Sequence, residues 1–151
     1  MPTPIIRSVT GTSVSRTFTN TIANNAYSNS ADALRIQQSA LSTPGLLLAD
    51  FRLTSVSFGT APVSGSVQLV RISRDASGNQ GPTPSATLVP NQVWTFGPLP
   101  QASNSSTGWI MAIPGPIALD ADADYWIYNN GTGYTMASGM VLTATPWSPG
   151  T

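Results

Sequence analysis

The spacing of apolar residues changes near residue 45, and beyond it the pattern is that of short strands. From Leu46 onward, alternating apolar and polar positions are interrupted by turns rich in glycine and proline. The sequence predicts strands over 46–58, 66–74, 92–96, 108–113, 117–119, 125–128, 133–137 and 140–144. Several short strands at intervals of about 8–12 residues are typical of an antiparallel sandwich or barrel.

The first of these strands contains a change of phase. Phe51 and Leu53 share one face of a regular strand, whereas Val56 and Phe58 share the other. A one-residue slip near Thr54-Ser55 is what a β-bulge produces. We therefore expect a bulge at that point.

Residues 1–45 are rich in serine, threonine, asparagine and alanine. Val14, Arg16 and Phe18 alternate with small polar residues, which predicts a short strand. The segment carries three Arg and one Asp, whereas the rest of the chain carries three Arg and five Asp. A segment opposite in charge to its own body is suited to lie on a neighbouring copy.

One short helix is predicted over 30–38. Ser30 is a suitable N-cap, Asp32 lies in the first turn, where the helix dipole favours an anion, and Thr43-Pro44-Gly45 follows as a stop. We therefore expect an all-β protein. An extended N-terminal arm, 1–45, carries this helix and precedes an antiparallel, jelly-roll-like β-sandwich domain, 46–151.

Composition removes most catalytic chemistry. The chain has no Lys, Glu, His or Cys, so its six positive charges are Arg and its six negative charges are Asp. A serine or threonine nucleophile needs a base, and neither imidazole nor amine is present. The absence of thiols excludes disulfides and thiolate metal sites. We expect no enzymatic activity, no catalytic residue and no cofactor.

Low charge also limits the partners. Charged residues make up 8% of the chain, well below the roughly 25% usual for soluble domains, which suggests a surface used for contacts. A surface solvated by hydroxyls and amides is the alternative. A net charge of zero argues against nucleic acid. The start lacks the features of a cleaved secretory signal, and no apolar run is long enough to span a membrane.

Asp120, Asp122 and Asp124 form the only dense acidic cluster. On an extended segment all three side chains would point the same way and repel each other, which a cation or an Arg would relieve. Hard cations such as Ca²⁺ bind several such oxygens. The favoured interpretation is a solvated turn, because Asp is common in turns, so these residues are weak metal candidates.

Aromatic residues are the main apolar resource of the chain. Trp126 and Tyr128 share one face of a predicted strand, and Trp147 lies between prolines in the tail. Core or interface positions are the favoured interpretation, and an exposed platform for sugars is the alternative. Arg7 and Arg16 are candidates for contacts with carboxylates on a neighbour. The interface candidates are Arg7, Arg16, Phe18, Trp126, Tyr128 and Trp147.

The succession of strands resembles that of a known group of proteins. The relevant segments are Leu53–Phe58 with the following Ala61-Pro62, Ser66–Val70, Val93–Pro100, Ile117–Leu119 and Tyr125–Asn129. They resemble small β-sandwich structural proteins from tailed-phage morphogenesis regions, and more broadly phage head decoration (cement) proteins. Related chains usually have Gly-Asp where Ala123-Asp124 stands here.

The resemblance implies a virion protein without enzymatic activity. It would be made in the host cytoplasm and bind the outer surface of an icosahedral capsid as a homotrimer, with the major capsid protein as its partner and the arm clasping neighbours. Two alternatives remain. One is a carbohydrate-binding module or the knob of a fibre, and the other is a tail or connector protein of the same virion.

Overall fold

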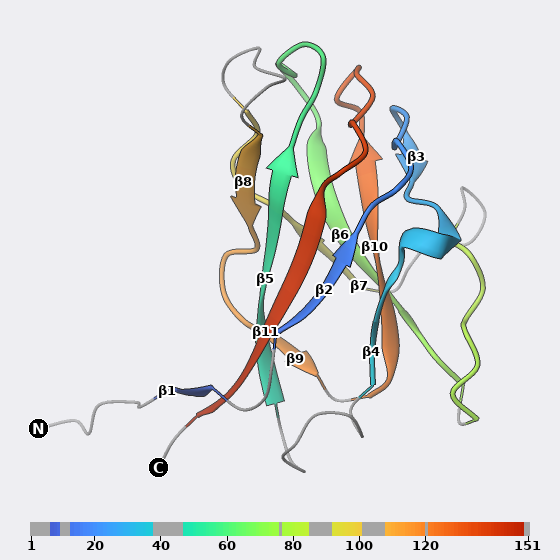
Figure 1. The fold of residues 1–151 in the computed structure, drawn as a ribbon, viewed down its shortest axis with the longest axis vertical. Helices are drawn as coiled ribbons and strands as arrows, with labels where there is room; N and C mark the ends of the chain where they lie inside the picture. The colour runs from blue at the N-terminus through green and yellow to red at the C-terminus, as the bar shows by residue number, and fades with distance from the viewer. Residues whose placement is uncertain are drawn as a thin grey trace, which may run out of the picture.

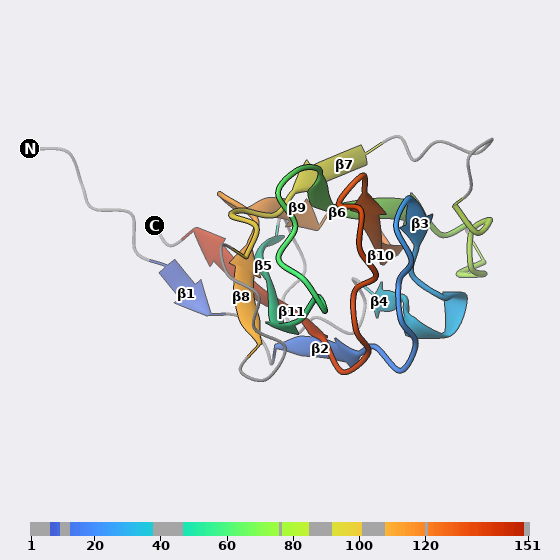
Figure 2. The same ribbon diagram turned by 90° about the horizontal axis from the view of Figure 1, so that it is seen from above.

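The computed structural model describes residues 7–9, 13–37, 47–75, 77–84, 92–100, 108–119 and 121–149. Two antiparallel sheets pack face to face, as Figures 1 and 2 show. This confirms the predicted all-β sandwich.

The first sheet has the order β1-β11-β5-β8, with β2 also paired to β11 and β9 to β5. Its strands are β1 (Arg7–Val9), β2 (Val14–Thr17), β5 (Leu47–Val56), β8 (Trp109–Ala112), β9 (Ile117–Leu119) and β11 (Val141–Pro149). The second sheet has the order β3-β10-β6-β7, with β4 also paired to β10. Its strands are β3 (Ala26–Tyr27), β4 (Leu34–Ile36), β6 (Ser66–Ser73), β7 (Gln92–Thr95) and β10 (Ala123–Asn130).

The predicted bulge is present in β5. The register between β5 and β8 shifts between Leu53 and Val56, and Ser55 has a positive φ of 55°. Because the bulge adds one residue, Phe51 and Leu53 before it and Val56 and Phe58 after it are all buried in the same core. This confirms the sequence interpretation.

Strand β10 is apolar on both faces. Tyr125 and Ile127 point into the core between the sheets, where the Tyr125 ring lies 4.7 Å from that of Phe51. Trp126 points the other way, into a smaller cluster with Val70 and Ile72 of β6. The outer face of the second sheet therefore carries a covered apolar cluster.

The N-terminal segment is built into the sandwich where the structure describes it. β2 pairs with β11, and both β3 and β4 pair with β10. Phe18, Ile22, Leu34 and Ile36 are each at most 2% exposed and belong to the main core. Residues 13–37 are thus part of the body rather than a separate arm, whereas the proposed boundary at residue 45 lies outside the described residues.

The predicted helix over 30–38 is wrong. A 3-10 turn, η1 (Ser30–Asp32), is followed directly by β4, and the cap is Asn29, whose Oδ1 accepts a hydrogen bond from the Ala31 N–H at 2.9 Å. Leu34 and Ile36 are buried and Arg35 between them is exposed, as in a strand. Pairing with β10 outweighs the local helix propensity.

Two strand predictions near the C-terminus differ from the structure. The segment 133–137 forms only isolated bridges, through Met136 to Ile22 and Phe58. β11 is longer than predicted and continues through Trp147, so this tryptophan lies in a strand rather than in a tail. No helix in the described part of the chain is long and apolar enough to cross a membrane.

Candidate functional site

The last residue of the acidic cluster, Asp124, does not lie in a solvated turn. Asp124 lies in β10 and is 1% exposed, and its Oδ1 accepts hydrogen bonds from Arg74 Nε at 3.2 Å and Nη2 at 2.8 Å. The guanidinium of Arg74 therefore compensates the charge of this carboxylate, the role that a metal ion would otherwise have. Asp122 is half-buried and Asp120 lies outside the described residues. Within the described ranges no group of three carboxylates is placed to hold a metal ion.

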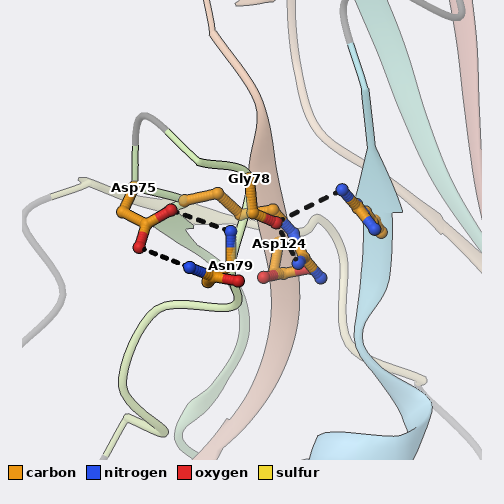
Figure 3. Close-up of polar contacts among 6 residues, drawn as sticks. Asp75, Gly78, Asn79 and Asp124 are labelled. Atoms are coloured by element: carbon orange, nitrogen blue, oxygen red, sulfur yellow. Dashed lines mark hydrogen bonds and ion pairs between the residues drawn. The ribbon is translucent and has the colours of Figure 1, made fainter.

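The loop after β6 is fixed by the same arginine. Arg74 Nη1 donates to the Gly78 carbonyl at 2.8 Å, and Arg35 Nη2 of β4 donates to the same oxygen at 3.3 Å (Figure 3). Asp75 closes the loop on itself by accepting from the backbone N–H and the side-chain amide of Asn79, at 2.8 and 2.9 Å. Hydrogen bonds from Asn79 hold the pKa of the exposed Asp75 below its ordinary value.

This loop packs onto the outer apolar cluster. A Cβ added to Gly81 would lie 2.5 Å from Cγ2 of Ile72, which neighbours Trp126. Trp126 is fully buried, and Tyr128 stacks on Tyr27 with ring centroids 4.4 Å apart. Burial, with the nearby Tyr128, raises the pKa of Tyr27. In this single chain, Trp126 is therefore inside the fold rather than at a surface.

The other interface candidates are distributed over the molecule. Phe18 is fully buried in the main core. Arg16 is exposed on β2, and its Nη2 donates to the carbonyl oxygen of Ala31. Trp147 is 9% exposed and lies opposite Leu48 of β5 and Val9 of β1. Arg7 lies opposite Pro149 at the end of β1. Of the six candidates, Trp126 and Tyr128 share the outer apolar cluster, and Arg7 and Trp147 lie near each other at the paired ends of β1 and β11.

Sequence reasoning did not identify Asp32 as a structural centre. Its carboxylate is fully buried and accepts four hydrogen bonds, from the backbone and side chain of Thr19 at 3.0 and 2.9 Å and of Asn20 at 3.1 and 3.0 Å. Burial raises the pKa of Asp32, but the four hydrogen bonds outweigh burial and hold it below the ordinary value. These hydrogen bonds connect η1, which contains Asp32, to the segment that follows β2.

A polar groove lies on the outer face of the first sheet. It encloses about 370 Å³, and its lining residues are Asp50, Arg52, Thr54, Thr143 and Thr145. We call these five residues the hydroxyl groove. The groove side chains alternate with buried side chains along β5 and β11. Each of these strands therefore has one face in the core and one face exposed to solvent. Sequence reasoning missed the groove, because its two halves are separated by about 90 residues in the chain.

Hydrogen bonds orient two of the groove hydroxyls. Thr143 Oγ1 is 3.0 Å from the Ser15 hydroxyl, and Thr145 Oγ1 is 3.1 Å from that of Ser13. The strand register sets Thr143 opposite Arg52 and Thr145 opposite Asp50. The groove thus contains hydrogen-bond donors and acceptors, and the charges of Asp50 and Arg52 give it a net charge of zero.

Comparison with known proteins gives no further identification. No family model, curated protein or solved structure matches the chain.

Proposed function

We propose that the chain is a non-enzymatic structural protein of a virion that binds the outer surface of an icosahedral capsid in repeated copies. The major capsid protein is its partner in this proposal, and the protein acts as a homotrimer. The observation that carries the proposal is the projection formed by β1 and the end of β11 (Figures 1 and 2).

This projection is a two-stranded ribbon. Beyond Trp147, residues Ser148 and Pro149 of β11 pair with β1 and with no other described strand. A two-stranded ribbon is marginally stable in water by itself. Its outer edge pairs with no other strand in the described ranges, so it offers backbone groups to a neighbour. Pairing or packing with a neighbouring subunit would stabilise the ribbon and provide hydrogen-bond partners for its backbone groups. This is expected of a segment that holds neighbouring subunits together in an assembly.

The charged side chains support a structural role. Asp32, Asp75 and Asp124 accept hydrogen bonds within the fold, and Arg74 is bonded to both Asp124 and Gly78. Groups engaged in this way position loops, and they are not poised for proton transfer to a substrate. Many copies, each making weak contacts, would bind a shell strongly through multivalency, and closure around a three-fold axis would limit growth.

The aromatic residues do not favour a sugar-stacking platform. All twelve Phe, Trp and Tyr residues lie in the described part of the chain, and Tyr134 alone is classed as exposed, at 39%. A platform of coplanar exposed rings would need at least two. The carbohydrate-binding alternative in that form is therefore the weaker proposal.

Co-sedimentation tests the proposal. The purified protein is mixed with empty shells of the virus that encodes it, and the bound fraction is measured with and without residues 1–12. Removing 1–12 deletes β1 but leaves every core residue of 13–37 in place. We expect saturable binding that weakens at least tenfold on truncation, whereas no binding by the full chain would contradict the proposal.

A further inference from the structure

We propose that the hydroxyl groove is a binding site for a neutral saccharide of one or two sugar units. This activity goes beyond capsid binding and does not depend on it. The lining contains no aromatic ring, so recognition would rest on hydrogen bonds to sugar hydroxyls. The volume of about 370 Å³ lies near the lower end of the range for small-molecule sites, roughly 300–1,000 Å³.

The polar groups of the groove are arranged in two facing rows. On β5, Asp50, Arg52 and Thr54 point outward, because the residues between them are buried. On β11, Thr143 faces Arg52 and Thr145 faces Asp50. Directly opposed side chains on antiparallel strands have Cβ atoms about 5 Å apart, so neighbouring groups can contact one ligand together.

The chemistry of these groups fits a polyol better than an ion. A guanidinium supplies only donors and a carboxylate only acceptors, whereas each threonine hydroxyl does both. Sugar hydroxyls also donate and accept, so a saccharide complements both the donors and the acceptors that line the groove. An anion would face Asp50 and a cation would face Arg52. The balance of one charge of each sign therefore selects a neutral ligand.

The groove is also partly preorganised. Thr143 and Thr145 are held by the hydroxyls of Ser15 and Ser13, and Thr54 Oγ1 donates to the Val141 carbonyl at 3.4 Å. Their rotamers therefore require little ordering when a ligand binds, which lowers the entropic cost. Without ring stacking we expect weak binding, with a Kd on the order of 1 mM.

The test is an NMR titration of the full ¹⁵N-labelled chain with glucose, galactose, mannose and N-acetylglucosamine, and with their disaccharides. We expect at least one sugar to shift amides of 50–54 and 143–145 in a saturable manner. Thr143→Val and Arg52→Gln should each weaken that binding at least fivefold. The matched control is Thr95→Val on β7 of the other sheet, which should leave the Kd unchanged.

The same spectra report whether each variant is folded, so loss of binding is separable from loss of structure. The proposal is overturned if no sugar causes saturable shifts, if the shifts lie elsewhere, or if both groove variants bind like the control. It is also overturned if the groove amides shift with protein concentration alone, which would assign this face to a second copy. Capsid co-sedimentation is a separate measurement, so failure of the saccharide proposal is distinguishable from failure of the capsid proposal.

Discussion

Arg74 donates two hydrogen bonds to a single oxygen of Asp124, from Nε at 3.2 Å and from Nη2 at 2.8 Å. The side chains are 11% and 2% exposed, so the pair is largely shielded from water. The third contact of the guanidinium, to the Gly78 carbonyl, extends this pair to the loop that packs on the outer apolar cluster. The ion pair and this third contact thus connect β10 to the loop after β6, which covers the outer face of β10.

Breaking this pair should destabilise the fold. Asp124→Ala leaves the Arg74 guanidinium partly buried without its counter-charge, which typically costs about 3 kcal/mol. Urea denaturation measures the loss. The control is Arg35→Gln, which removes the other arginine bonded to Gly78, but an exposed one. We expect the control to cost less than about 1 kcal/mol. Equal effects of the two variants would show that the pair has no special role.

Acid should weaken the fold partly through Asp32. Its folded-state pKa lies below that of the unfolded chain, so the carboxylate stabilises the fold above the unfolded-state value of about 3.9. That contribution is lost as the pH falls through the folded-state pKa. Asp32→Asn presents an NH₂ group to backbone and side-chain donors, and should cost about 2 kcal/mol at pH 7.

The difference between wild type and Asp32→Asn should therefore shrink as the pH falls below about 4. Denaturation curves at pH 7, 5, 4 and 3 measure it. A difference that stays constant over this range would mean that the titration of Asp32 is not linked to folding.

The bulge in β5 requires glycine at a neighbouring position. Gly108 has a φ of +65°, and a Cβ there would lie 2.8 Å from the Cα of Ser55. Gly108→Ala should cost about 2 kcal/mol, because it adds both backbone strain and a contact with rigid main chain. At Gly59, where an added Cβ meets no atom within 4 Å, the same substitution should change stability by less than about 0.5 kcal/mol. Thermal denaturation of both variants distinguishes this account from one in which the bulge adjusts freely.

Sequence and structure agree best where the signal is local. The phase change between Phe51 and Phe58 predicted the bulge, since core-facing side chains must stay on one face. The strand at Leu34–Ile36 was missed because only pairing with β10, far away in the chain, makes it a strand. The ion pair of Asp124 and the two halves of the hydroxyl groove also depend on contacts between distant strands. Those contacts follow from topology, which the spacing of residues does not reveal.

The proposed homotrimer has a direct signature in solution. Light scattering over a concentration series should give three times the chain mass of 15.7 kDa. Removal of residues 1–12 should shift the mass toward that of one chain, because it deletes β1 from the projecting ribbon. A monomer in both forms would exclude a preformed trimer and leave assembly on the shell itself as the only route.

The position of the protein in the particle tests the central proposal most directly. Cryo-electron microscopy of intact virions should show density for a two-layered sandwich repeated at equivalent positions on the outer surface of the capsid. The ribbon of β1 and β11 should contact a neighbouring subunit there. A bare outer shell would contradict the account, and sandwich density confined to the tail would assign the protein to the tail instead.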